Sequence, residues 1–340
     1  MRAVNPAHSR AKRILGTAVI AGLAAGCFAA AAQAAPADTA RLQQAWRASI
    51  ARTPAPGKGC FTASYPLTVW QKVGCVTAPE RPYIPRTGTG GAAQTTGDGN
   101  DYAAVTTTLT AAAVGSFPKA KHLTSETGAG GRSNFYSLQL NSNFMSGSPA
   151  CAHAVDPSKC LAWEQFVYSS SSHASFMQYW LIHYSGTGVS CPGGWNNFSD
   201  DCYKNSSAVG VPLQAITELP HMSISGAAVH GGIDTFVTTT ATNAYTTTGN
   251  DSVTFLADGW HESEFNVVGD GGGSAANFNA GTALTVRIDL TDGSNAKPGC
   301  AAGHGTTGET NNLNLGVCKA KKGKDTTLPS VQFVESLPKN

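Results

Sequence analysis

The chain has 340 residues, of which only 13% are charged, and its formal net charge is +2. Four of its 23 basic residues lie within the first 13 positions, so the remainder carries 19 basic against 21 acidic residues and is close to neutral. This balance predicts no basic face for nucleic acid or an anionic membrane. After position 34 no run reaches the ~18 uncharged apolar residues of a membrane span.

Residues 1–34 have the three-part pattern of a secretory signal peptide. The basic start contains Arg2, Arg10, Lys12 and Arg13. An Ala/Gly-rich apolar run follows from Ile14, and Ala32-Gln33-Ala34 offers a small-residue cleavage site. We expect a secreted, extracellular or periplasmic protein that begins near Ala35. Ala24-Ala25-Gly26-Cys27 leaves a lipoprotein cleavage site open, although alanine replaces the aliphatic residue usual three places before the cysteine.

Eight cysteines follow the signal, and an even number in an exported chain predicts disulfides. The simplest connectivity joins sequence neighbours: Cys60 to Cys75, Cys151 to Cys160, Cys191 to Cys202 and Cys300 to Cys318. Each short loop would stabilise the fold by ~2 to 3 kcal/mol in the chain-entropy model. Short C-x-x-C spacings typical of zinc are absent. Other pairings of the eight remain open.

Residues 35–100 are predicted to form an N-terminal segment of three parts. Apolar residues at four-residue spacing predict a short helix over 39–52, ended by prolines. Residues 60–85 are a disulfide-closed module rich in aromatics and prolines, interpreted either as a packing arm or as a pro-segment removed on activation. The Gly/Thr/Ala-rich stretch 87–100 is typical of a flexible linker.

Residues 101–340 consist of short runs rich in Thr, Val, Phe and Tyr, separated by clusters of Gly, Asn, Asp and Ser. Runs such as NFYSLQLN (134–141), SFMQYWLIHYS (175–185) and SEFNVVGD (263–270) are predicted strands. Helical periodicity is not sustained in any comparable stretch. The pattern predicts one all-β domain, an antiparallel two-sheet β-sandwich of the concanavalin or jelly-roll type. We expect a monomer.

Most familiar catalytic motifs are missing from the sequence. The histidines show no H-x-H or H-E-x-x-H spacing, no G-x-S-x-G elbow is present, and paired cysteines leave no free thiol. We therefore expect no metal and no cofactor. The run GDGGGS (269–274) lacks the acidic spacing of a calcium loop, which favours a glycine turn between strands.

The stretch GWHESEFNVVGD (259–270) gathers three acids in a chain that has few charges. Glu262 and Glu264 are two apart, so on a strand they would face the same side ~6 to 7 Å apart. This resembles the acidic strand of sandwich-fold glucanases, which use paired carboxylates. Those enzymes spread three acids over a longer apolar strand, a register that is not met here.

A second resemblance follows the order of several motifs. AWEQFVYSSSSHASFMQYWLIHY (162–184), followed by SISGAA, GGIDTF, SEFNVVGD and FNAGTALTV, resembles the eqolisin or glutamic peptidase family over roughly residues 134–290. Members of that family are secreted acid proteases built as two-sheet β-sandwiches, with one glutamine and one glutamate as the catalytic pair. Trp163, followed fifteen residues later by Gln178 within FMQYW, matches the family's Trp-then-Gln arrangement. Glu264-Phe265 matches the pair that opens the second catalytic strand.

The resemblance implies Gln178 and Glu264 as catalytic residues and Trp163 and Trp180 as lining of the substrate groove. One departure is clear, because the position of the family's catalytic glutamate falls on Val268. Glu264 has the same strand parity as Val268 and so faces the same side. In such a pair the carboxylate deprotonates a water, and the amide orients that water and donates to the oxyanion. A carboxyl that titrates near pH 4.3 suits work in acid.

The sequence thus predicts an exported acid endopeptidase that acts on polypeptides. The alternative is a non-catalytic extracellular β-sandwich that binds polysaccharide or a surface partner, and Val268 supports it. The plain interpretation of Gln178 and Glu264 is that both are ordinary outward-facing strand residues. The enzyme hypothesis requires the Gln178 amide and a carboxyl within reach of one shared water, roughly 8 Å at hydrogen-bond lengths of ~3 Å.

Overall fold

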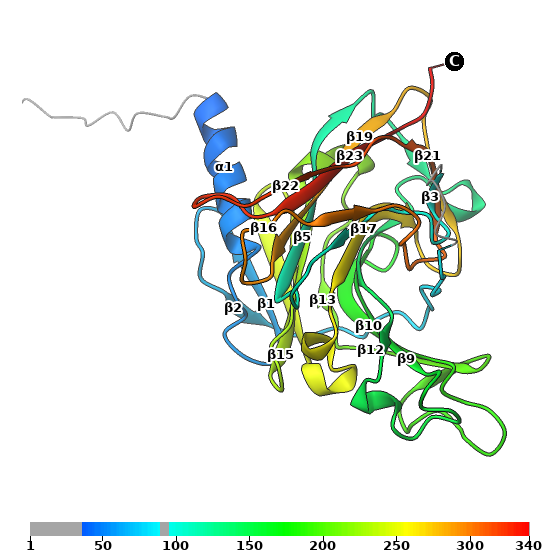
Figure 1. Cartoon of the computed structure of the whole chain (residues 1–340). Coiled ribbons are helices and arrows are strands. Elements are labelled where there is room, and N and C mark those ends of the chain that lie inside the picture. The colour runs from blue at the N-terminus through cyan, green and yellow to red at the C-terminus, as the bar shows by residue number, and fades with distance from the viewer. Residues whose placement is uncertain (1–35, 89–94, 340) are drawn as a thin grey trace, which may run out of the picture.

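The computed structural model describes residues 36–88 and 95–339 as a β-sandwich with one N-terminal α-helix (Figure 1). Two sheets made almost entirely of antiparallel pairs confirm the predicted all-β, two-sheet fold. The predicted signal peptide at 1–34 lies outside the described residues. Within the described ranges no helix is both long and apolar enough to cross a membrane.

The first sheet has thirteen strands. Its main path runs through β2 (Gln71–Val73), β1 (Cys60–Ser64), β16 (Asn243–Asn250), β15 (Ile233–Thr239), β14 (Ser223–Ala227), β5 (Ala112–Lys121), β19 (Ala283–Thr291), β23 (Ser330–Ser336), β21 (Thr310–Leu315), β18 (Ala275–Phe278) and β6 (Glu126–Thr127). Two further strands join it, β22 (Lys319–Lys321) on β23 and β3 (Thr95–Gly97) on β21. The pair β18 and β21 is parallel.

The second sheet has ten strands. Its path runs through β11 (Asn196–Phe198), β12 (Asp201–Asn205), β10 (Ala174–Ile182), β9 (Leu161–Ser169), β7 (Tyr136–Ser142), β17 (Glu262–Gly269), β4 (Ala103–Val105) and β20 (Gly299–Ala301). Two short strands attach to it, β13 (Val209–Gly210) on β10 and β8 (Met145–Ser146) on β9. The connections include the 3-10 helices η1 (Ala129–Gly131), η2 (Pro149–Cys151), η3 (Ile216–His221), η4 (Asp251–Val253) and η5 (Leu256–Asp258).

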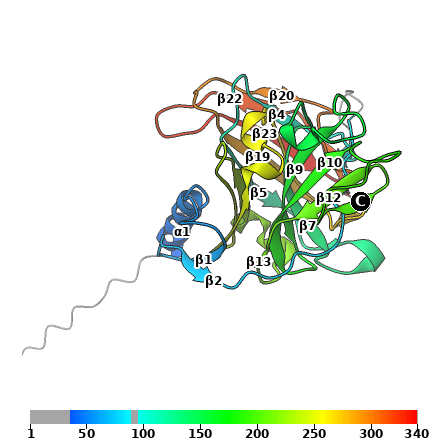
Figure 2. The ribbon, with the colours of Figure 1, turned by 90° about the horizontal axis from the view of Figure 1, so that it is seen from below.

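The helix α1 (Pro36–Ile50) confirms the helix predicted over 39–52. Its buried residues Trp46 and Ile50 pack with Ala63 of β1 and Ala244 of β16. Figure 2 shows α1 beside β1, on the side of the first sheet away from β7, β9 and β10. The helix therefore covers the first sheet and leaves the outer face of the second sheet to other segments.

The main core lies between the sheets and decides which side chains face outward. Phe265 of β17 points into this core, where its ring centroid lies 5.0 Å from that of Phe117 on β5. Gly115 of β5 allows this approach, because a Cβ there would overlap the Phe265 ring. Since strand side chains alternate, Glu264 and Asn266 lie on the opposite, outer face of the second sheet.

The four disulfides have the connectivity predicted from neighbouring cysteines. Their Cα–Cα distances run from 5.3 to 6.3 Å, within the usual range. Disulfides form and persist in oxidising compartments, so these four indicate an extracellular type of environment.

The N-terminal segment 35–100 contributes strands to the first sheet. β1 and β2 lie at one edge of that sheet, and β3 pairs with β21. The predicted linker 87–100 falls partly on residues 89–94, which are outside the described ranges, while its residues 95–97 form β3.

Candidate functional site

A row of polar side chains crosses the outer face of the second sheet. Strand pairing places Asn205, Gln178, Gln165, Asn141 and Glu264 directly opposite one another on β12, β10, β9, β7 and β17. The last four of these side chains are buried. The two predicted catalytic residues therefore share one face and one level of the sheet. Two strands lie between them, which separates their backbones by ~14 Å at the usual strand spacing.

Gln178 and Glu264 are engaged with different partners. The Gln178 amide turns toward β12, where Nε2 donates to Asn205 Oδ1 at 2.8 Å. The Glu264 carboxylate accepts from the backbone N–H and the hydroxyl of Thr306, both at 2.7 Å, and from Asn141 Nδ2 at 3.0 Å. The structure brings the two residues onto a common face but does not pair them directly.

An extended segment of the same chain covers this row. We call residues 76–86 the strap; in Figure 1 it belongs to the light-blue trace that runs from β1 and β2 toward β3. At its start, Val76 exchanges two backbone hydrogen bonds with Ala208. At its end, Arg86 N donates to Thr306 O at 2.8 Å. The strap therefore crosses the strands along the polar row, from the β12 side of the sheet to the Glu264 side.

Gln178 binds the main chain of the strap at two points. Its Oε1 accepts from Tyr83 N at 2.7 Å, and its Nε2 donates to Arg81 O at 2.9 Å. Trp180 Nε1 donates to the same Oε1 at 3.0 Å, and Asn205 accepts the second hydrogen of Nε2. A glutamine amide has two donors and two acceptor positions, so its hydrogen-bonding capacity is fully used. The Gln178 amide therefore binds the main chain of residues i and i+2 of an extended peptide.

Glu309 binds the strap from another direction, and sequence reasoning did not identify it. Its Oε1 accepts from Ile84 N at 3.1 Å and from Gly273 N at 3.0 Å. Its Oε2 accepts from Gln139 Nε2 at 3.2 Å and from the Thr307 hydroxyl. The residue is fully buried immediately before β21, and this burial raises the pKa of its carboxyl.

Gln178 and Glu309 therefore contact consecutive residues of the strap. Successive N–H groups of an extended chain point to opposite edges, so the amide and the carboxyl lie on opposite edges of the strap at Tyr83 and Ile84. In GETNNLNL, Glu309 is an isolated acid before a short strand. Only the path of the strap reveals its position.

Glu264 has a carboxyl neighbour of its own. Burial, followed by the charge of nearby Glu264, holds the pKa of Asp101 well above its ordinary range. Asp101 therefore holds a proton more readily than an ordinary aspartate. A hollow of about 330 Å³ lies beside these two acids, lined in part by Glu262, His304 and Thr306. Glu264, however, is separated from Gln178 by two strands.

Trp163 and Trp180, predicted to line a substrate groove, are both fully buried. They belong to one aromatic cluster, in which the Trp180 ring stacks on Tyr203 with 5.1 Å between centroids. Trp163 Nε1 donates to Ser142 O at 3.0 Å. The two indoles pack on the same face of the sheet as Gln178, and Trp180 fixes the orientation of its amide.

The turn formed by GDGGGS (269–274) connects β17 to β18 and contacts the strap. Gly272 N donates to Pro82 O at 2.8 Å, and Gly273 N donates to Glu309. Gly271, Gly272 and Gly273 all have positive φ, a conformation that favours glycine. The glycines of this run thus form a turn that closes over the strap.

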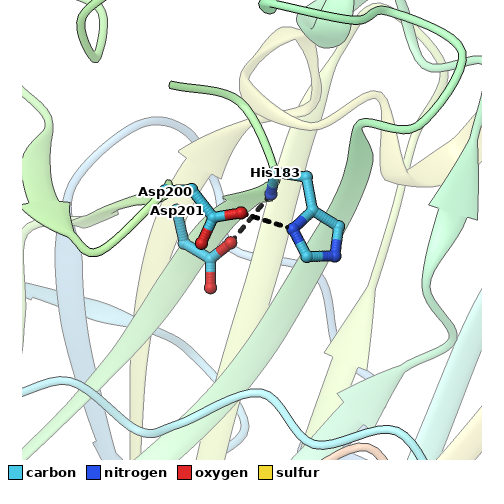
Figure 3. Close-up of side chains that lie close together, drawn as sticks. All are labelled: His183, Asp200 and Asp201. Atoms are coloured by element: carbon cyan, nitrogen blue, oxygen red, sulfur yellow. Dashed lines mark hydrogen bonds and ion pairs between the residues drawn. The ribbon is translucent and has the colours of Figure 1, made fainter. Parts of the chain in front are cut away.

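A histidine and two aspartates gather elsewhere, on the connection between β10 and β12 (Figure 3). His183 Nδ1 lies 2.7 Å from Asp200 Oδ2, and the His183 backbone N–H donates to Asp201 Oδ1 at 2.8 Å. The hydrogen bond from His183 lowers the pKa of Asp200. Since one carboxylate already binds the backbone, and the loop is also closed by Cys191–Cys202, we interpret this group as a loop clamp.

Buried acids without cationic partners are numerous in the described residues. Nine carboxylic side chains are buried, and Asp270 alone among them lies within 4 Å of a cationic group, that of Arg81. The other eight are Asp101, Glu126, Glu164, Asp234, Asp251, Glu264, Glu309 and Glu335.

Burial raises the pKa of several of these carboxyls. The pKa is about 7 for Glu126 and Glu335 and about 8 for Asp234, and it is well above its ordinary range for Glu164. An unpaired buried carboxylate is costly, whereas its protonated form is neutral. The interior is therefore better suited to acid than to neutral solution.

No protein family model, no curated protein and no solved structure was found to match this chain. The resemblance to glutamic peptidases therefore rests on the sequence motifs.

Proposed function

We propose that the chain is an exported hydrolase of peptide bonds that works in acid, and that the outer face of the second sheet is its active face. One observation carries the proposal. The main chain of Arg81 to Ile84 lies across this face, with the amide of Gln178 on one edge and the carboxyl of Glu309 on the other. A substrate peptide would take the same course once the strap has moved away.

The two side chains suffice for acid-base hydrolysis. An ionised Glu309 takes a proton from water, whose oxygen attacks the carbonyl carbon of the substrate, and the same carboxyl then returns the proton to the leaving amine. Gln178 Nε2 donates to the Arg81 carbonyl, two peptide units before the one whose N–H Glu309 accepts, so a substrate would lie in a register shifted from that of the strap for Nε2 to donate to its developing oxyanion. The raised pKa of Glu309 favours proton return, and it places the ionised form that the first step needs toward the upper end of the acid range.

Glu264 is the competing candidate for the carboxyl, and it is the one that the sequence predicts. It shares the face with Gln178, but its backbone is ~14 Å away at the usual strand spacing. We assign the acid-base role to Glu309 because it and Gln178 contact consecutive residues of one peptide.

The buried acids support the acid part of the proposal. Burial raises the pKa of six buried carboxyls of the described residues that have no cation within 4 Å, so the folded chain is adapted to solutions in which its substrate-handling carboxyl also titrates; the six are Asp101, Glu126, Glu164, Asp234, Glu309 and Glu335.

The test is cleavage of a denatured protein by the purified full chain between pH 2 and 5, with pepstatin present. The chain carrying Tyr83→Ala is assayed beside it, because this variant removes the side chain that anchors the strap. We expect cleavage, strongest for Tyr83→Ala. In that background, Gln178→Ala and Glu309→Gln should each lower the rate by at least ~100-fold.

The matched variant Glu264→Gln separates the two assignments. It should keep the rate within about tenfold of its parent, since it alters a buried carboxyl that the assigned reaction does not use. A large loss for Glu264→Gln with little change for Glu309→Gln would move the role back to Glu264. If neither the full chain nor the Tyr83→Ala chain cleaves anywhere in this range, the enzyme proposal is wrong.

A second candidate function is peptide binding without cleavage. Val268 at the family's acid position and the fully used amide of Gln178 favour it. In that case the variants above would remain folded and bind peptide, yet release no fragments. Binding of polysaccharide, the alternative ligand, would show as retention on insoluble polysaccharide.

A further inference from the structure

We infer that the outer face of the second sheet is a receptor for a proline-spaced, extended peptide containing Arg-Pro-Tyr, with a dedicated pocket for the tyrosine. The strap is then an in-chain copy of the ligand. This inference names the ligand class of the proposed active face, but it does not require cleavage.

Tyr83 occupies a closed pocket. Its side chain is completely buried in a small apolar cluster with Val167, Ala174, Phe176 and Ala208. The Phe176 ring centroid lies 5.9 Å from that of Tyr83. Burying an aromatic ring of this size is strongly favourable, so the pocket is the main apolar anchor of the strap.

A buried carboxylate at the end of this pocket accepts a hydrogen bond from the tyrosine hydroxyl. The Tyr83 hydroxyl donates to Asp270 Oδ1 at 2.6 Å. The other oxygen of Asp270 is already held by the Ser169 hydroxyl at 3.0 Å and by Ser171 N at 3.1 Å. The acceptor is therefore fixed before a ligand arrives. A phenylalanine in the pocket would leave Asp270 Oδ1 without that donor, which should weaken binding by ~10-fold or more.

The arginine two residues earlier reaches the same carboxylate. Arg81 Nη1 lies 3.4 Å from Asp270 Oδ2 and also contacts the Asp270 backbone oxygen. Its guanidinium carbon lies 5.5 Å from the centroid of the Phe135 ring, which allows a cation–π contact. Since one acid receives both the guanidinium and the hydroxyl, the site favours arginine and tyrosine with one residue between them.

The prolines of the strap complete the pattern. Pro79, Pro82 and Pro85 recur every third residue, the period of a polyproline II helix. Proline has no N–H that would need a partner, and its carbonyl remains free to accept. Asn205 Nδ2 donates to Pro79 O and Gly272 N to Pro82 O, both at 2.8 Å. Peptides that already favour this extended form lose less entropy on binding.

The strap competes with any free peptide because it is tethered to its own site. A short tether gives an effective concentration of order millimolar, so the intact chain should bind added peptide weakly. Weakening the anchor in the chain, and not in the peptide, should expose the site. The Tyr83→Ala chain is the natural receptor for this measurement.

The experiment uses a fluorescent peptide with the strap sequence VTAPERPYIPR and measures polarisation with the full-length chain at pH 6 and 4 °C. We expect the Tyr83→Ala chain to bind it at least ~10-fold more tightly than the unaltered chain. Replacing the peptide's tyrosine by phenylalanine should weaken binding by ~10-fold or more, and replacing it by alanine should abolish detectable binding.

A second variant covers the case in which Tyr83→Ala does not fold, as judged by circular dichroism. Tyr83→Phe keeps the ring and removes only the hydroxyl. The tyrosine peptide should displace the strap of this variant more readily than that of the unaltered chain. The inference is overturned if no folded variant binds the tyrosine peptide better than the unaltered chain does, or if the phenylalanine peptide binds equally well. Absence of acid cleavage alone would leave this binding unaffected.

Discussion

The amide of Gln178 shows how one side chain can fix the path of a peptide on the outer face of the second sheet. It is buried, its four hydrogen-bonding positions are occupied, and two of its partners belong to the main chain of the strap. Main-chain contacts of this kind fix the path of a peptide without selecting its side chains. Selection comes instead from the pocket around Tyr83 and from Asp270.

Replacing Gln178 by methionine tests how much of the stability depends on this amide. Gln178→Met leaves groups of Arg81, Tyr83, Trp180 and Asn205 without that partner, and we expect a loss of about 2 to 4 kcal/mol in the free energy of unfolding. Urea denaturation measures it.

Gln165→Met is the matched control. Gln165 stands opposite Gln178 on the neighbouring strand and is equally buried, but its side chain makes one hydrogen bond, from Nε2 to Gln139 Oε1 at 3.2 Å. We expect a loss of no more than about 1 kcal/mol. Equal losses for the two variants would show that the strap contacts of Gln178 contribute little to stability.

Sequence reasoning reached Gln178 but missed Glu309, and the reason is physical. Gln178 lies within a short continuous apolar run of the kind that forms a buried strand, so its burial follows from the local pattern. Glu309 matters because a segment more than 200 residues earlier in the chain brings Ile84 to it. Such a contact leaves no periodic signal. Glu264 was placed on the correct face by parity, but parity does not give the number of strands between two residues.

The elements that hold the strap are a turn and a pair of backbone bridges. The glycine turn 269–274 closes over it, with Gly271 so close to Arg81 that a Cβ would overlap that side chain. The helix and many strands followed from periodicity. The path of the strap could not be predicted from periodicity, because three prolines and few apolar residues give it neither a period of two nor one of 3.6.

Two alanine substitutions in this turn separate backbone strain from contact with the strap. Gly271→Ala and Gly272→Ala both place a Cβ on a residue with positive φ, at a similar cost of about 1 kcal/mol each. At Gly271 the new Cβ also meets Arg81, whereas at Gly272 nothing lies within 4 Å. We expect Gly271→Ala alone to speed hydrogen exchange in residues 76–86, measured by mass spectrometry. Equal exchange in both variants would contradict a close contact between turn and strap.

At the scale of the whole molecule, the buried acids set the dependence of stability on pH. A carboxyl whose folded pKa exceeds its unfolded value binds protons more tightly in the native state. Its contribution is therefore complete below the unfolded pKa and is lost as pH rises through the folded pKa. For Glu335, from an ordinary 4.5 to about 7, this contribution amounts to roughly 3 kcal/mol.

We therefore expect the chain to be more stable at pH 4 than at pH 8, by roughly 5 °C or more in Tm from Glu335 alone. Differential scanning calorimetry across this range measures the effect. Glu335→Gln removes the titrating group while keeping its shape, so its Tm should vary less with pH than that of the unaltered chain. A Tm that rises steadily from pH 4 to pH 8 would contradict the assigned pKa directions.

The bridge between Cys60 and Cys75 ends one residue before the strap begins, and β1 fixes the same region in the first sheet. A single cut after Arg86 would therefore not release the strap. Its new C-terminal end could leave the face and bind again, because residue 76 remains attached. Permanent removal of the strap from the outer face of the second sheet would require a second cut near Val76. In a chain cut once, the attached strap would still compete with added ligands for the face. In a chain cut twice, the face would be free to bind them.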